Sequence, residues 1–368
     1  MAAIQIDDLR RHAIARTLFR PTTLAQAVRR LGFLQADPMR APARAQDLIL
    51  MHRVRDYRAG ELEQRYPRLR LEEDCVVNYG FVPRELLALL HPRQARRPWD
   101  AKTQAQAAEL LAHVRAHGRA HPREVQQVFA HHGRTVGYWG GEQNASTQLL
   151  DGLHYRGQLR VLRREGGTRI YAPVDHAVQD DSPQARQARA EALLDLVLRL
   201  YAPLPLASLG YLTSLLRYGA PQLQAECRQA FKTVRERHPH LRLDGETWVW
   251  PEGENPRSAR HRVEPERLRW FAPFDPLVWD RRRFEQLWGW TYKFEAYTPA
   301  AQRTMGHYAL PMLWGDRMLG WANLSVQDGR LRHELGFVDS RPRTPAFRRA
   351  LEQALHEMHG FLGLDPAR

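Results

Sequence analysis

The segment LGFLQADPMR, residues 31–40, places an amide and a carboxylate two positions apart in an otherwise apolar run. In an extended segment alternate side chains share a face, so Gln35 and Asp37 would point together while Ala36 points away. A carboxylate can polarise a water molecule and stabilise a developing cation, and an amide can orient the same water. The alternative is a plain turn, because an aspartate before a proline often caps or turns the chain. These residues alone leave both interpretations open.

The histidines do not form a recognisable metal-binding motif. His113, His117 and His121 recur every four residues, but a glycine breaks the expected helix before the third, and no fixed carboxylate completes a ligand set. His356 and His359 do not match the H-E-x-x-H zinc motif. We therefore expect no metal and no cofactor, and interpret these histidines as solvated or DNA-facing.

The composition indicates a polyanionic partner. The 368 residues carry a formal net charge of +14, and the only lysines are Lys102, Lys232 and Lys293, so arginine supplies nearly all of the positive charge. Guanidinium groups bind phosphate oxygens bidentately, which favours nucleic acid. The two cysteines, Cys75 and Cys227, exclude a disulfide framework and are expected to be small core residues. No signal peptide or transmembrane run is evident, so we expect a cytoplasmic, nucleoid-associated monomer and no membrane partner.

The strongest structural pattern lies in residues 104–173. Three helical segments are followed by QLRVLRREGGTRIYAPV, whose two arms alternate around Gly166-Gly167. Three helices and a two-stranded hairpin predict a winged helix-turn-helix. The wing, residues 158–174, is a basic ribbon suited to a DNA backbone, and its candidate DNA contacts are Arg160, Arg163, Arg164 and Arg169. We assign three more arginines, Arg40, Arg44 and Arg303, to the same role.

The rest of the chain indicates related units and a different C-terminal part. Residues 7–66 are predicted to form helices, including 23–33 and 43–54. The first of these two can be capped by Thr22 or Thr23, and its apolar residues Leu24, Val28 and Leu31 recur at helical spacing. Residues 183–251 resemble a degenerate third copy, with a hairpin turning at Asp244-Gly245. After a Pro-rich linker, residues 269–339 indicate antiparallel strands, which favour a small barrel or curled sheet before a terminal helix. We predict an α+β chain of three tandem winged helix-turn-helix domains, 1–98, 99–178 and 179–255, and a β-rich domain, 256–368.

Several segments together resemble one known family. LGFLQADPM, LHYRGQLRVLRREGGTRIYAPV and FAPFDPLVWDRRRFEQLWGWTYKFEAYTPAAQRTMGHYALPMLWGDRMLG are similar to segments of the YcaQ/AlkX/AlkZ family of bacterial winged-helix DNA glycosylases. The resemblance runs from about residue 7 to 345. It implies three winged helices and a C-terminal β-barrel around duplex DNA, and excision of N7-alkylated purines and unhooking of interstrand crosslinks. It also implies that Gln35-Ala36-Asp37 is the catalytic element, with Gln35 and Asp37 as catalytic residues.

The implied chemistry needs water and no lysine nucleophile. An N7-alkylguanine is already cationic, so its glycosidic bond has a good leaving group. Asp37 would stabilise an oxocarbenium-like sugar, and Gln35 would fix the approach of a water molecule. This favours a monofunctional glycosylase over a Schiff-base lyase.

One departure and two alternatives qualify this interpretation. Many family members carry a Trp and a His where this chain has EEDCVVNYGFVP, residues 72–83, so its lesion range is expected to be shifted or narrowed to monoadducts. A non-catalytic tandem winged-helix regulator is the main alternative, since the fold serves both roles. It has no use for a carboxylate facing phosphates, which makes Asp37 the discriminating residue. An RNA-binding protein is a weaker alternative, because no RNP-like motif appears.

Overall fold

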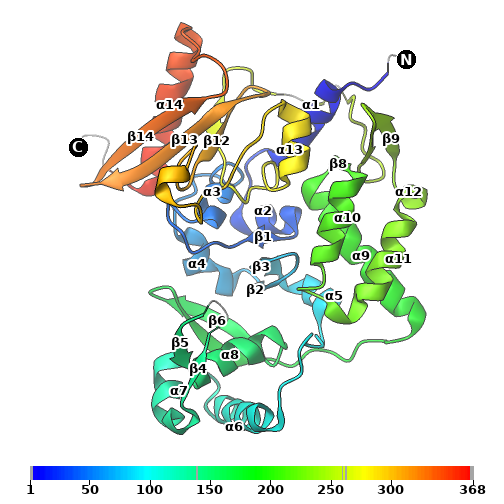
Figure 1. Ribbon diagram of the computed structural model, residues 1–368, viewed down its shortest axis with the longest axis vertical. Helices are drawn as coiled ribbons and strands as arrows, with labels where there is room; N and C mark the ends of the chain where they lie inside the picture. Colours follow the sequence, from blue (N-terminus) through cyan, green and yellow to red (C-terminus); the bar gives the residue numbers. More distant parts are fainter. Residues whose placement is uncertain (1–2, 138–139, 259, 262, 365–368) are drawn as a thin grey trace. The chain divides into compact units, whose positions relative to one another are not determined.

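The computed structural model describes residues 3–137, 140–258, 260–261 and 263–364 (Figure 1). The chain is α+β, as predicted, and forms two units assembled from non-consecutive segments. Unit 1 comprises Met1–Leu62, Asp195–Leu212 and Lys232–Arg368, and unit 2 comprises Glu63–Leu194 and Thr213–Phe231. The division into four consecutive domains stays a prediction. Within the described ranges, no helix is long and apolar enough to cross a membrane.

Short helices lead to the segment that carries Gln35 and Asp37. Thr23 caps the second of them by accepting a hydrogen bond from the Gln26 N–H, and Gly32 ends it in a positive-φ conformation (76°) that glycine adopts without strain. The buried side chains of this helix are Leu24, Ala27, Val28 and Leu31, which confirms the predicted apolar face. The elements are α1 (Ile6–Thr17), α2 (Leu24–Leu31), β1 (Leu34–Gln35), α3 (Ala45–Met51) and α4 (Glu61–Arg65).

The predicted hairpin at Asp244-Gly245 is present in unit 1. Both turn residues have positive φ, 49° and 80°, as a two-residue hairpin turn requires. Its strands, β9 (His240–Leu243) and β10 (Glu246–Val249), pair antiparallel, and β8 (Leu204–Pro205) pairs with the other edge of β10. The helices of residues 183–251 are α9 (Pro183–Tyr201), α10 (Leu206–Leu215), η4 (Pro221–Leu223), α11 (Gln224–Lys232) and α12 (Val234–Arg237), of which η4 and nearly all of α11 belong to unit 2.

The C-terminal sheet of unit 1 is antiparallel, as predicted, and it is open, so of the two predicted forms, a small barrel or a curled sheet, the barrel is wrong. Its order is β11-β12-β13-β14, and every neighbouring pair is antiparallel. Phe347 of the terminal helix contacts Trp314 and Phe337 of the sheet at ring distances of 5.4 and 6.0 Å. The helix covers apolar side chains that a barrel would have enclosed. The elements are β11 (Leu268–Trp270), α13 (Arg281–Trp288), η5 (Ala300–Gln302), β12 (Leu310–Trp314), β13 (Arg317–Gln327), β14 (Arg330–Phe337) and α14 (Pro345–Leu362).

Unit 2 contains the predicted three helices and basic hairpin in the expected order. Leu110, Leu150 and Val161 are completely buried in its core. Gly166 and Gly167 close the hairpin with φ values of 55° and 88°. The helical elements are η1 (Tyr66–Arg68), η2 (Arg84–Leu86), α5 (Leu87–Leu90), α6 (Ala101–His117), α7 (Pro122–Val128), η3 (Ala130–His132) and α8 (Ala145–Tyr155). The strands form the pairs β2 (Leu71–Cys75) with β3 (Tyr79–Pro83), β4 (Arg134–Val136) with β5 (Glu142–Asn144), and β6 (Leu159–Glu165) with β7 (Thr168–Pro173).

A buried ion pair joins three segments of unit 1. The Arg53 guanidinium donates two hydrogen bonds to the Asp275 carboxylate, at 2.8 and 3.0 Å, and neither side chain is exposed to solvent. Arg53 also donates to the carbonyls of Thr17 and Ile49, at 2.9 and 2.6 Å. One guanidinium therefore connects the end of α1, helix α3 and the loop before α13.

We expect Asp275→Ala to lower the free energy of unfolding by about 3–5 kcal/mol, because it leaves the buried Arg53 charge unpaired. Asp316→Ala is the matched control, since the Arg11–Asp316 pair is solvent-accessible and 3.4 Å long, and its loss should cost less than about 1 kcal/mol. Urea denaturation of both variants measures the difference. Equal effects would contradict this account of the buried pair.

Candidate active site

Gln35 is held in one orientation by a residue far away in the sequence. Its side chain is 5% exposed, at the end of β1. The indole Nε1–H of Trp279 donates a hydrogen bond of 2.8 Å to Gln35 Oε1. The amide oxygen is therefore directed to Trp279, which leaves the NH2 group of the same amide to face other partners.

Asp37 closes a turn and keeps a perturbed carboxyl group. The Met39 N–H donates to Asp37 Oδ1 at 2.9 Å, so the turn that the sequence predicted as one of two alternatives is present. The Asp37 N–H donates to Oε1 of Gln46, a buried residue of α3, at 3.1 Å. Asp37 is half-buried, and burial raises its pKa above the ordinary value of 3.8, while the bond from Met39 lowers it less. The turn thus fixes a carboxylate in a partly desolvated position.

A buried tyrosine lies within the electrostatic reach of Asp37. Tyr308 is 3% exposed. Burial raises the pKa of Tyr308, and the charge of Asp37 raises it further. Within the part of the chain that the structure describes, the Tyr308 hydroxyl has no hydrogen-bond partner. A phenol that remains protonated beside a carboxylate can donate to a water molecule or a substrate oxygen.

The loop before Tyr308 is rigidly fixed and presents an exposed aromatic ring. Glu295 accepts backbone N–H bonds from Thr304 at 2.9 Å and Met305 at 2.7 Å. Burial raises the pKa of Glu295, but these bonds outweigh it, so the net pKa is below its ordinary value. Tyr297 is nevertheless 86% exposed. Its ring lies 6.1 Å from that of Phe294, which in turn lies 5.5 Å from the ring of Tyr308.

A groove of about 900 Å³ begins at the Tyr308 side of this site. The strands β13 and β14 form much of its wall. Its lining includes Ala41, Gly306, Tyr308, Asn323, Arg332 and His333. A groove of this size with polar walls can hold a nucleotide-sized group.

Three of the predicted DNA-contacting arginines lie in the same unit as Asp37. Arg40 is exposed and Arg44 half-buried, in the short segment between Asp37 and α3. Arg303 is half-buried, and its Nε donates to the Thr298 carbonyl at 2.8 Å, so it also helps to fix the loop of Tyr297.

The other four predicted DNA contacts belong to the wing in unit 2, where they form internal ion pairs. Arg160 binds Glu72 at 2.8 Å, and Arg164 binds Glu73 at 2.6 Å. The remaining two pairs are Arg163 with Glu165 at 2.5 Å, and Arg169 with Asp151 at 3.0 Å and Glu73 at 3.6 Å. DNA contact by the wing stays a prediction. It requires guanidinium N–H groups that do not take part in these ion pairs.

The acidic segment of β2 has a role that the sequence did not reveal. Glu72, Glu73 and Asp74 are 3, 2 and 5% exposed. Asp74 binds Arg93 at 2.7 Å and His91 at 2.6 Å, so each of the three carboxylates has a cationic partner. These acids neutralise arginines inside unit 2, which explains why three of them occur in a row on a buried strand.

The cysteines do not contribute a nucleophile. Burial raises the thiol pKa to about 11 for Cys75 and about 12 for Cys227. Both thiols are therefore protonated at neutral pH, where only the thiolate would be reactive. The prediction of small core residues is confirmed for the buried Cys227, whereas Cys75 is half-buried.

Comparison with protein families identifies the chain. A family model described as "DNA glycosylase AlkZ-like" matches residues 28–361. The match covers Gln35, Asp37, the wing and Trp279, and the chain belongs to the AlkZ-like DNA glycosylase family. No solved structure matches the chain.

We expect the wing arginines to fall into two groups, those whose loss destabilises the fold and those whose loss has little effect on stability. Arg164→Ala leaves the fully buried Glu73 carboxylate without its main partner, and should lower the free energy of unfolding by about 3 kcal/mol. Arg163→Ala removes a pair of which both side chains are more than one-third exposed, and should change it by less than about 1 kcal/mol. Chemical denaturation of the two variants tests this, and a stable Arg164→Ala variant would refute the structural role.

Proposed function

We propose that this protein is a monofunctional DNA glycosylase that excises N7-alkylated purines and unhooks interstrand crosslinks. The observation that carries the proposal is the half-buried carboxylate of Asp37, fixed in a turn two residues after the oriented amide of Gln35. The family supplies the reaction class, hydrolysis of an N-glycosidic bond in DNA. The choice of alkylated base and the roles of the two residues are the proposed part.

The proposed chemistry uses charge stabilisation by Asp37. Departure of a cationic N7-alkylpurine leaves positive charge on the sugar, and a carboxylate about 4 Å away would stabilise that charge by about 4 kcal/mol at an effective dielectric constant of 20. This corresponds to roughly a thousandfold in rate. The amide of Gln35, held by Trp279, would orient the attacking water. The base leaves as a neutral species, so no protonation of it is needed, and the attacking water loses a proton to the Asp37 carboxylate or to bulk water as its oxygen bonds to the sugar.

The proposed substrate is duplex DNA. The positive net charge suits a phosphate backbone, and Arg40 and Arg44 lie close in sequence to Asp37. The helices and hairpin of unit 2 have the order of a winged helix-turn-helix. This order supports the proposal of a tandem winged-helix architecture, in which the number of such domains is itself part of the proposal.

Asp37→Asn should lower the single-turnover excision rate by about a thousandfold, because the amide carries no charge. DNA affinity should stay unchanged or increase, because a negative charge near phosphates is removed. The assay uses duplexes with one N7-methylguanine or one N7-linked crosslink, with abasic sites scored after mild alkali and spontaneous loss subtracted. Because burial raises the pKa of Asp37, wild-type excision should fall on acidification with a midpoint above pH 3.8.

Asp328→Asn, in an exposed turn, is the matched control for Asp37→Asn and should leave excision unchanged. Full activity of Asp37→Asn would refute the mechanism. Tight DNA binding without excision by the wild-type protein on both substrates would favour the regulator.

The exposed ring of Tyr297 is proposed to stack on a DNA base beside the lesion. Tyr297→Ala should weaken binding or excision by about tenfold, since a base–aromatic stack contributes about 1–3 kcal/mol. Tyr297→Phe keeps the ring and should retain wild-type values. The test is the fluorescence of 2-aminopurine placed next to the lesion, together with the excision rate. Wild-type behaviour of Tyr297→Ala in both measurements would exclude stacking.

A further inference from the structure

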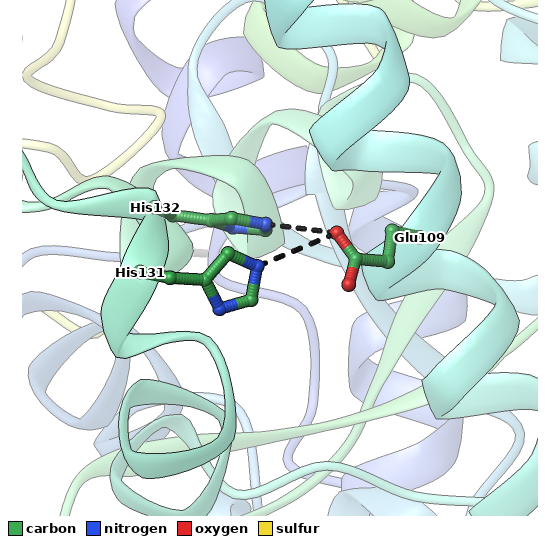
Figure 2. A group of neighbouring side chains, drawn as sticks. All are labelled: Glu109, His131 and His132. Atoms are coloured by element: carbon green, nitrogen blue, oxygen red, sulfur yellow. Dashed lines mark hydrogen bonds and ion pairs between the residues drawn. The ribbon is translucent and has the colours of Figure 1, made fainter.

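Two histidines and a glutamate converge on the surface of unit 2 (Figure 2). Glu109 lies on α6, and His131 and His132 are consecutive residues of η3. Figure 2 shows both imidazole rings directed toward the same carboxylate. The Nε2 atoms of His132 and His131 lie 3.2 and 3.7 Å from Glu109 Oε2.

These separations are short enough for one metal ion to contact all three side chains. Zinc binds imidazole nitrogen and carboxylate oxygen at about 2.0–2.1 Å, which separates two ligand atoms by about 3.3 Å. One ligand atom from each of the three residues lies within 4.8 Å of the other two. Two imidazoles and one carboxylate with a further position open to water is a donor set that zinc uses in proteins.

The site combines a rigid ligand with accessible ones. The His132 side chain is 1% exposed, and its ring packs 5.0 Å from that of the buried Phe129. Glu109 and His131 have side-chain exposures of 54 and 60%, so an ion can enter and the two side chains can adjust.

The sequence did not reveal this site because its ligands are not regularly spaced. His113 and His117 drew attention through their four-residue spacing, whereas the carboxylate that completes the set is Glu109, one helical turn before His113. Its histidine partners are 22 and 23 residues further along the chain, on a separate element. Only the packing of η3 against α6 brings the three together.

We propose that Glu109, His131 and His132 bind a first-row transition metal cation, with Zn²⁺ as the expected ion and water as the fourth ligand. The ion would join α6 to η3 and so stabilise unit 2. This binding goes beyond the proposed excision reaction, which uses no metal.

The test is equilibrium dialysis of the full-length, tag-free protein against zinc chloride without DNA, followed by elemental analysis. The wild-type protein should bind zinc, and His131→Gln and Glu109→Gln should each weaken this binding by about 100-fold or more, since loss of even an outer partner costs 10–100-fold. Both substitutions are at exposed positions, and circular dichroism verifies that the variants fold. Zinc should also raise the Tm of the wild-type protein but not of these variants.

His117→Gln, an exposed histidine two turns after Glu109 on α6, is the matched control and should bind zinc as tightly as the wild-type protein. Magnesium chloride at the same concentration should not raise the Tm, since Mg²⁺ prefers oxygen ligands. Wild-type zinc affinity in both His131→Gln and Glu109→Gln would overturn the proposal. A loss of affinity in His117→Gln would overturn this ligand set in favour of another.

Discussion

The buried ion pair between Arg53 and Asp275 is the constraint on which the geometry of unit 1 depends. It fixes the loop that contains Asp275 against α3. In this loop the backbone N–H of Trp279 donates a hydrogen bond to the Asp275 carbonyl at 2.8 Å. Trp279 then holds Gln35, while Gln46 on α3 holds the backbone of Asp37. Each of these contacts is directional and short, so the positions of the amide and the carboxylate follow from one neutralised charge inside the unit. Burying such a pair is costly unless every donor is satisfied, which the carbonyls of Thr17 and Ile49 help to achieve.

Sequence patterns predicted those structural elements that are determined by residues close together in the chain. The cap at Thr23, the apolar face of α2 and the glycine turns at Gly166 and Gly245 are determined by neighbouring residues, and the structure contains them. The sequence left a small barrel and a curled sheet open, and the barrel was wrong, because the number of strands and their apolar character do not specify whether a sheet closes or is covered by a helix. Here Phe347 and its neighbours on α14 cover it. The short β4–β5 pair was also missed, because three-residue strands carry too little pattern.

The sequence predicted only part of the candidate site, for the same reason. Gln35 and Asp37 stand out because polar side chains interrupt an apolar run. Their partners do not stand out, since Trp279 lies 244 residues away from Gln35, and Tyr308 looks like one more aromatic residue in an aromatic-rich stretch. Sequence spacing could not reveal that the β2 carboxylates face the wing arginines either. Long-range pairing of this kind is a property of the packed chain, and composition gives no direct measure of it.

The internal pairing of the wing lowers the number of arginines that are available to DNA, whereas the formal net charge of +14 already counts the paired acids. Phosphate binding releases counterions only from cations that are free to approach the backbone. Arg160 and Arg164 already have a buried carboxylate of β2 as their counterion, at 2.8 and 2.6 Å. The ionic atmosphere around this protein is therefore smaller than its arginine content indicates. A count of basic residues would therefore overstate the number of phosphates from which the protein displaces counterions. The surface electrostatic potential is a better guide to the area that contacts DNA.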